Sequence, residues 1–175
     1  MKRIILEKLN KWKTSKRRKP LLLRGARQVG KTWVLKEFGK SFPDGFLHID
    51  FDKQIEYRQF FEQTKDVKRI LANLAMASGK KITENTLIIF DEIQACESAL
   101  NSLKYFCEDA PQYSVVGAGS LLGLKLASGF PVGKVEFLDM HPMTFTEFLL
   151  ASGDRNLVEY LDTIETPENI PQAFM

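Results

Sequence analysis

Eight consecutive residues near the start of the chain have types and a spacing that suit the binding of phosphate. They run Gly25, Ala26, Arg27, Gln28, Val29, Gly30, Lys31 and Thr32. These residues match GxxxxGK[ST] at every position, and the two glycines allow backbone angles that gather N–H groups around an anion. A helix beginning here adds partial positive charge, Lys31 would neutralise the β- and γ-phosphates, and Thr32 would place its hydroxyl on Mg²⁺. The pattern predicts a P-loop.

A second set of reactive residues is an acidic pair that follows an apolar run. Leu87–Phe90 leads directly into Asp91 and Glu92. Open α/β sheets bind ligands at the carboxyl ends of their strands. Asp91 would hold Mg²⁺, directly or through water, and Glu92 would orient and polarise the attacking water. The pair could instead cap a helix near Ala95, but its combination with the P-loop favours a Walker B motif.

Four further side chains could adjust this chemistry. Ser120 follows the fourth expected strand and is a candidate sensor of the γ-phosphate, although it could equally be a loop serine or a helix cap. Arg27 occupies a variable loop position and either touches a phosphate or points outward. Asp50 and Asp52 end the second expected strand, where they would influence water or metal or serve as ordinary loop acids.

The elements that must position these residues alternate between strand and helix. Apolar runs predict strands at Leu21–Leu23, Phe46–Phe51, Leu87–Phe90, Tyr113–Val116 and Val135–Leu138. Helical spacing predicts helices over 3–13, Lys31–Gly39, 53–79 in two pieces, Ser98–Cys107 and Phe145–Leu150. This alternation indicates βαβ units and a parallel sheet, so the expected fold class is α/β.

Capping residues mark several helix ends. Thr64 is expected to be an N-cap and Gly79 a C-terminal stop. Thr144 and Glu147 have the spacing of a capping box. The Gly-rich residues 120–133 predict a mobile loop, and no strong element is expected from residue 152 onward.

The composition is that of an ordinary globular chain, with 175 residues, 44% of them hydrophobic, and a net charge of +3. The charge is uneven, because residues 1–19 hold nine Lys or Arg against one Glu. Such a segment can contact nucleic acid or a membrane surface. The simpler interpretation is a solvated helix face and a linker, since no aromatic interleaving or base-reading motif accompanies the charges.

The remaining composition argues against several other classes. Cys96 and Cys107 are too far apart for CxxC redox chemistry or a zinc site, and only His48 and His141 accompany them. No secretory signal opens the chain, and no apolar stretch approaches the ~20 residues that a bilayer span needs. A cytoplasmic protein without a membrane partner is therefore expected.

Taken together, GARQVGKT, LIIFDEIQ, VVGAGSLLG and PVGKVEFLDMHPMTFTEFL resemble the AAA-type P-loop ATPases of bacteria and archaea that carry a C-terminal domain of unknown function. The similarity covers residues 18–150. It implies a P-loop NTPase three-layer αβα sandwich, with a parallel five-stranded sheet in the order 5-1-4-3-2. It also implies ATP rather than GTP, in agreement with the absence of an NKxD-type guanine-reading motif.

The resemblance carries over to individual residues by position. The nucleotide loop would run from Gly25 to Thr32 and continue into Trp33, which departs from the small polar residue that often follows the motif. Asp91 and Glu92 would be the Walker B acids. Ser120 would be the sensor, in a GAGS segment less serine-rich than is usual.

Members of this family are usually longer, with a helical lid, a winged-helix-like part and a nuclease-like C-terminal domain. The chain therefore divides into a basic helix and linker (1–19), an ATPase core (20–152) and the start of a lid or linker (153–175), as in a truncated chain. The expected partners besides ATP are an appended effector domain or protein, and possible further copies in a homo-oligomer.

The leading hypothesis is an ATPase that uses Mg²⁺ and couples hydrolysis to a conformational change. Hydrolysis by this chain alone is expected to be weak, because no arginine finger is identifiable. One alternative is a regulatory module that holds ATP and barely hydrolyses it. Another is a DNA-associated ATPase that uses residues 1–19.

Overall fold

The structure is a computed structural model, which describes residues 3–120 and 132–163. Most of the Gly-rich segment expected to form a loop, and most of the segment expected to begin a lid, lie outside these residues. The short 3₁₀ helix η3, Val132–Lys134, follows the first gap.

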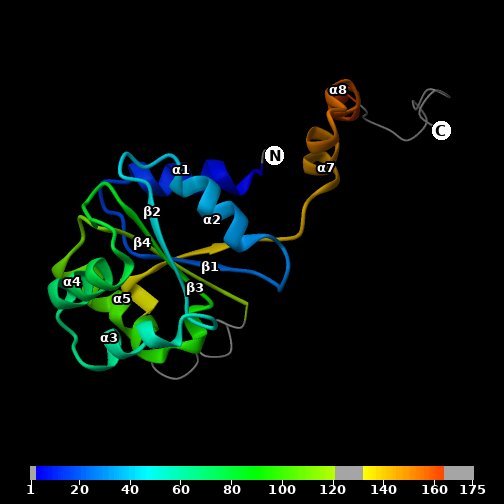
Figure 1. The fold of residues 1–175 in the computed structure, drawn as a ribbon. Helices are drawn as coiled ribbons and strands as arrows, with labels where there is room; N and C mark the ends of the chain where they lie inside the picture. Colours follow the sequence, from blue (N-terminus) through cyan, green and yellow to red (C-terminus); the bar gives the residue numbers. More distant parts are fainter. Residues whose placement is uncertain (1–2, 121–131, 164–175) are drawn as a thin grey trace.

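A parallel sheet forms the centre of the molecule (Figure 1). Its strands are β1 Leu21–Arg24, β2 Phe46–Asp50, β3 Leu87–Asp91, β4 Ser114–Gly119 and β5 Glu136–Asp139. They lie in the order β2-β3-β4-β1-β5, and every pairing between neighbours is parallel. The expected order 5-1-4-3-2, read from the other edge, is confirmed.

Helices cover one face of this sheet because alternate strand residues point to it. On that face lie α1, Ile5–Thr14, and α2, Lys31–Gly39. Leu21, Leu23, Leu87 and Ile89 join them in a continuous buried cluster. Gly39 approaches Phe46 so closely that an added Cβ would lie 2.5 Å from the ring. Helix and strand can therefore meet only without a side chain at that position.

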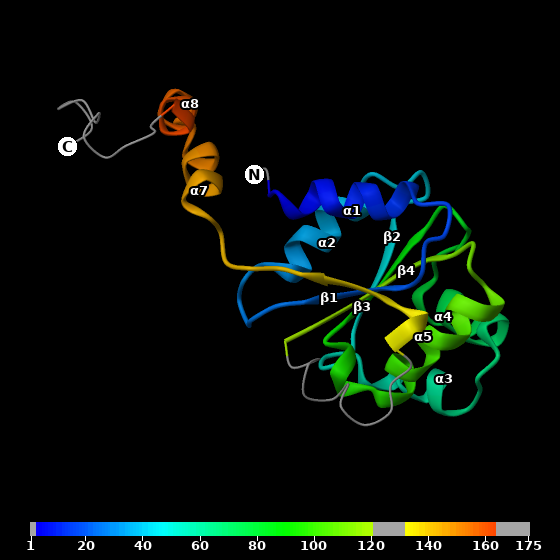
Figure 2. The same cartoon turned by 180° about the vertical axis from the view of Figure 1, so that it is seen from behind.

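Other helices cover the opposite face of the sheet (Figure 2). The intervening strand residues bury a second cluster there. There Leu22, Ile88, Phe90 and Val115 contact a second group of helices. These helices are α3 Gln59–Glu62, α4 Val67–Ser78 and α5 Glu97–Asp109. A sheet buried on both faces explains why β3 reads as an unbroken apolar run. The fold is a three-layer α/β sandwich of the P-loop NTPase type.

Helix caps follow the sequence expectations with one exception. Gly79 ends α4 in the left-handed region with φ 65°, and Thr144 and Glu147 form the expected capping box. The prediction of Thr64 as an N-cap is wrong, because the Asp66 carboxylate accepts from Lys68 N at 2.9 Å and caps α4. The Thr64 hydroxyl accepts from Asp66 N and forms the turn before the helix.

Two helices follow β5 and project from the body (Figure 1). The first, α7, runs Phe145–Ser152 and ends at Gly153 with φ 97°. The second, α8, covers Arg155–Thr163 and contradicts the expectation of no strong element beyond residue 152. Its apolar residues Leu157 and Leu161 have helical spacing, but the helix is short and mostly exposed. In the described ranges 3–120 and 132–163, no helix combines the length and apolar character that crossing a bilayer requires.

Helix α1 is part of the core despite its many basic residues. Ile5, Leu9 and Trp12 are buried against the sheet side of the helix, and the Trp12 indole donates to Lys19 O at 2.8 Å. Lys8 is exposed on the outer face. The charges of this segment thus accompany an apolar stripe that holds it in place.

Replacing Leu9 with alanine is expected to lower the free energy of unfolding by about 2–4 kcal/mol, because a fully buried leucine leaves a cavity. The neighbouring exposed position provides a control, since Lys8→Ala should change the same quantity by less than about 0.5 kcal/mol. Urea unfolding followed by circular dichroism measures both. Equally small effects would mean that α1 does not pack on the sheet in solution.

Candidate functional site

The P-loop residues connect the end of β1 to the start of α2. Gly30 adopts φ 94° directly before the helix, a backbone conformation that favours glycine. Gly25 has a different reason for being glycine, because an added Cβ would lie 2.3 Å from the Met140 carbonyl oxygen. Gln28 also has a positive φ, 64°, although it carries a side chain. The loop is thus shaped both by its own backbone and by the segment after β5.

Lys31 lies over this loop with only 6% of its surface exposed. Its ammonium group donates to Gly25 O at 2.9 Å and to Ala26 O at 2.7 Å. Burial lowers the pKa of the Lys31 amine, and the nearby carboxylates of Glu92 and Asp91 oppose that shift. A buried cation held by two carbonyls, beside the start of a helix, is suited to attract an anion.

Asp91 lies opposite the loop at the carboxyl end of β3 and is 2% exposed. Its Oδ2 accepts from the Thr32 hydroxyl at 2.6 Å and lies 3.1 Å from His48 Nε2. Its Oδ1 accepts from Glu92 N at 3.1 Å. Burial raises the pKa of the Asp91 carboxyl, but these hydrogen bonds outweigh burial and leave it below its ordinary value. The carboxylate is therefore held ionised beside a hydroxyl group.

His48 is a site residue that the sequence reasoning missed. It belongs to β2, where Asp50 pairs with Asp91 of β3 in parallel register. Alternation along a strand puts residues 46, 48 and 50 on one face, the face that α2 covers. The alternation could have predicted which face His48 lies on. Its closeness to Asp91 could be predicted only if β2 were known to neighbour β3.

Glu92 adopts a left-handed backbone with φ 46°, which is uncommon for a residue with a side chain. Its carboxylate accepts a hydrogen bond from the amide of Gln94. Unlike Asp91, Glu92 is only half-buried. The two adjacent acids therefore have different environments, one enclosed and one facing a cleft.

A cleft of about 500 Å³ brings the loop together with Glu92, the second acid of the pair. Its lining residues are Arg27, Gln28, Gly30, Lys31, Thr32, Trp33, Asp52, Glu92 and Gln94. The exposed side chains of Arg27, Trp33 and Asp52 lie at its rim. Asp50 is held elsewhere, since its carboxylate accepts from Asp52 N and lies 3.3 Å from Lys53 Nζ.

Ser120 follows β4, the strand that lies between β1 and β3. Its hydroxyl oxygen is buried, and within residues 3–120 and 132–163 it has no hydrogen-bond partner. It is not among the residues that line the cleft. The strand order thus places Ser120 at the end of the strand between the P-loop strand and the strand of the acidic pair.

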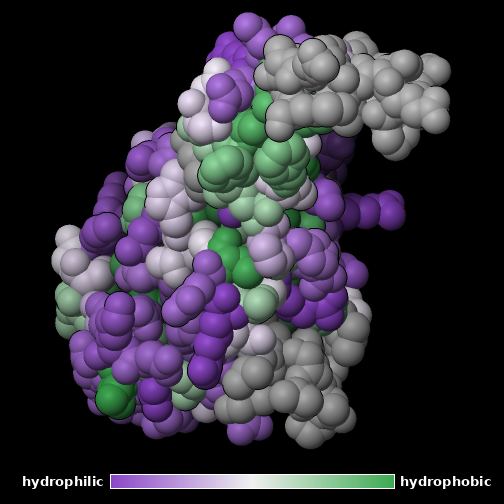
Figure 3. Space-filling view, turned by 90° about the vertical axis from the view of Figure 1, so that its right-hand side faces the viewer, coloured by the Kyte–Doolittle hydropathy of each residue, from purple (hydrophilic) through white to green (hydrophobic). Residues whose placement is uncertain are grey.

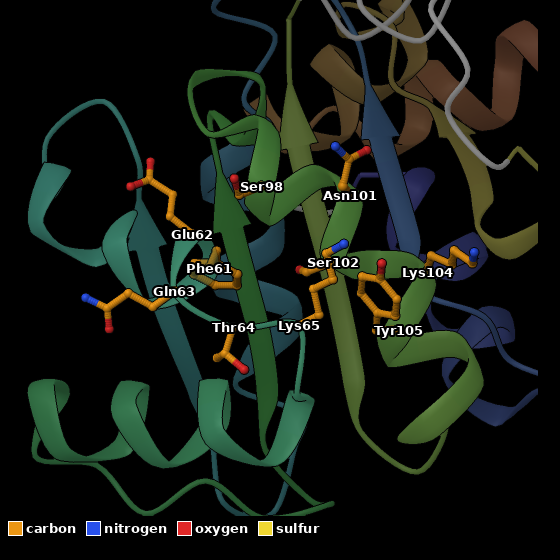
Figure 4. Close-up of a pocket in the computed structure, with 10 residues that line it drawn as sticks. All are labelled: Phe61, Glu62, Gln63, Thr64, Lys65, Ser98, Asn101, Ser102, Lys104 and Tyr105. Carbon is orange, nitrogen blue, oxygen red and sulfur yellow. The ribbon is translucent and has the colours of Figure 1, made fainter.

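A larger cleft of about 740 Å³ lies between the segment before α4 and the helix α5 (Figure 4). Glu62, Lys65, Asn101 and Tyr105 are among its lining residues. It contains neither a glycine-rich turn nor paired carboxylates. We therefore take the smaller cleft as the candidate site, because of the residues that line it and despite its smaller volume.

Four chemical groups lie together at the edge of the sheet where the smaller cleft opens. They are a buried ammonium, a hydroxyl, an ionised carboxylate and a second acid that faces the cleft. Hydroxyl and carboxylate oxygens are ligands that Mg²⁺ accepts, together with water and phosphate oxygens. A cation beside backbone N–H groups at a helix start suits phosphate. The residues present fit a nucleotide with its divalent ion.

Comparisons with known proteins find a matching family model and similar solved structures. A family model described as "AAA domain" matches residues 17–149, and no curated protein matches the chain. Among solved structures, C. elegans PCH-2 has 14% identity and a TM-score of 0.47, over 97% of this chain and 48% of that one. Pif1 helicase from Candida albicans has 13% identity and a TM-score of 0.46, over 97% and 44%.

The chain spans about half the length of these two structures or less. The family model, in contrast, covers well over half of the chain itself and includes the loop, the acidic pair and all five strands. The chain therefore belongs to the family of AAA domains.

Proposed function

We propose that this chain binds ATP with Mg²⁺ in the cleft around the P-loop, hydrolyses it slowly and changes conformation with the nucleotide state. Membership of the AAA domain family supports a nucleotide-binding ATPase in general terms. The observation that carries the finer proposal is the 2.6 Å hydrogen bond from the Thr32 hydroxyl to the Asp91 carboxylate. This bond joins the P-loop to the acidic pair beside a buried lysine.

In the proposed complex, the loop N–H groups and Lys31 bind the phosphates. The Lys31 ammonium, which now donates to two loop carbonyls, would donate to β- and γ-phosphate oxygens instead. Thr32 and Asp91 would hold the metal ion through their oxygens. Bound there, Mg²⁺ would neutralise charge that develops on the transferred phosphoryl group.

Glu92 is the residue that we assign to water activation. Its half-buried carboxylate lines the cleft, where it would orient the attacking water and accept a proton. Ser120 would report on the γ-phosphate from the end of the neighbouring strand. An arginine finger from another chain would complete the charge stabilisation, so turnover by this chain alone should be slow.

The alternative of a regulatory module that barely hydrolyses ATP has one observation in its favour. The amide of Gln94 already donates to the Glu92 carboxylate. A carboxylate occupied in this way is a weaker base for water. The two functions share the same binding site and differ in whether Glu92 acts in turnover.

Lys31→Ala is expected to weaken ATP binding about 10- to 100-fold, because it removes a charge-assisted hydrogen-bond donor to phosphate. Lys36→Ala is the matched control, since Lys36 lies exposed on the same helix. Titration with a fluorescent ATP analogue, with and without Mg²⁺, measures the affinities. A folded wild-type protein that ignores millimolar adenine nucleotides would remove the proposal altogether.

Glu92→Gln is expected to reduce phosphate release about 10²- to 10⁴-fold, the usual contribution of a general base. The affinity for ATP should change little, because the substitution keeps the shape of the side chain. Glu97→Gln, at an exposed acid on α5, serves as the control. Unchanged phosphate release in the Glu92 variant would favour the regulatory module, and turnover of several per second would contradict slow hydrolysis.

A further inference from the structure

Arg3 is a buried charged residue that the nucleotide chemistry above does not use. Its side chain is 5% exposed, as is the side chain of its ion-pair partner Glu147, which lies in α7. Removing two charges from water is costly unless both are paired and hydrogen-bonded. The contacts that offset this cost are therefore informative about what Arg3 does.

One guanidinium group joins three separate segments. Arg3 Nη1 donates to Val29 O of the P-loop at 3.2 Å, and Nη2 donates to His141 O after β5 at 3.0 Å. Arg3 Nε donates to Glu147 Oε1 at 3.1 Å. Because the guanidinium is planar and rigid, it holds these three acceptors in a fixed relation to one another.

The carboxylate of Glu147 is fully engaged on its side of the pair. Its Oε1 also accepts from Ile4 N at 2.8 Å, and its Oε2 accepts from Thr144 N at 2.9 Å as part of the capping box. Burial raises the pKa of the Glu147 carboxyl, but the hydrogen bonds from Thr144, Ile4 and Arg3 outweigh it and keep the pKa below its ordinary value. The first turn of α7 is thus fixed to the start of α1.

The linker between β5 and α7, residues 140–144, also packs against the P-loop. Met140 N donates to Arg24 O at 2.7 Å, and Met140 O occupies the space where a side chain on Gly25 would be. Arg3 Nη1 and Met140 Cε both lie 3.8 Å from the position of an added Cβ on Gly30. A shift of the loop would therefore disturb Arg3, the linker and α7 together.

We propose that Arg3 is a positioning residue that couples the P-loop to α7 and α8. Binding of ATP to the loop would fix the Val29 carbonyl, and Arg3 would transmit that restraint through Glu147 to the projecting helices. This inference rests on the proposed function, because it requires a nucleotide in the P-loop. By linkage, the position of α7 would in turn influence the affinity for ATP.

The projecting helices carry the surface that such coupling would move. Phe145 is 64% exposed and Phe148 57% exposed on α7. Apolar side chains gather on this part of the molecule (Figure 3). A change in the position of α7 would therefore move this apolar surface relative to the body. A nucleotide-dependent switch could act on other molecules through such a movement.

Hydrogen exchange of the full chain, with and without saturating ATP and Mg²⁺, tests the coupling. In the wild type, ATP should slow exchange of the P-loop amides and, through Arg3, of the amides in 144–163, by about fivefold or more if the coupling has the usual size. In Arg3→Met, saturating ATP should still protect the P-loop but leave 144–163 unchanged. A merely structural role would destabilise the variant without abolishing this difference between bound and free protein.

Four further variants sharpen the comparison. Arg17→Met changes an exposed arginine of the same segment and should respond as the wild type does. Glu147→Gln should lose the response in 144–163, and adding Arg3→Met to it should cause no further loss. If Arg3→Met does not fold, Arg3→Lys replaces it, because one ammonium cannot serve three divergent acceptors and should keep less than half of the response.

The outcomes separate the inference from the function on which it rests. Protection of the P-loop without any change in 144–163 of the wild type would overturn the coupling and leave ATP binding intact. A wild-type response in Arg3→Met would overturn the role of Arg3. ATP that protects no part of the chain would remove the proposed function, and the coupling with it.

Discussion

The parallel pairing of all five strands is the constraint on which the rest of the structure depends. Because every neighbouring pair is parallel, the carboxyl ends of the strands meet at a single edge of the sheet. The P-loop after β1, the acidic pair at the end of β3 and Ser120 after β4 consequently occupy that edge. An antiparallel β3 would place Asp91 at the opposite edge, out of reach of the Thr32 hydroxyl.

Burial of charge is the energetic conflict that this arrangement creates. Lys31, Asp91, Arg3 and Glu147 are each at most 6% exposed, and burying an ion is unfavourable unless it is paired. The structure resolves the conflict in two ways. Arg3 and Glu147 pair with each other and with the neighbouring backbone, whereas the Lys31 ammonium donates to two loop carbonyls. The second solution leaves an ammonium that phosphate oxygens would bind better, because they are charged.

Features that depend on residues adjacent in the sequence could be predicted from the sequence. Contacts between residues distant in the sequence could not, because they depend on how the chain folds. The P-loop and the acidic pair are contiguous motifs beside apolar runs, so their elements could be predicted. His48 needed the order of the strands, and the pair Arg3–Glu147 joins residues 144 positions apart. Thr64 and Asp66 are both plausible caps by type, and the cap is Asp66 because α4 begins at the buried residue Val67.

Backbone conformation supports the smaller cleft as the candidate functional site, independently of its side chains. Among the described residues, positive φ angles without glycine occur at Gln28 and Glu92. Both of these residues line that cleft. Such conformations are unfavourable by about 1–3 kcal/mol each and persist where the surrounding structure imposes them, commonly at functional sites. Gln28 belongs to the P-loop and Glu92 to the acidic pair, so the strain falls on the two segments that would have to adjust when a phosphate is bound or released.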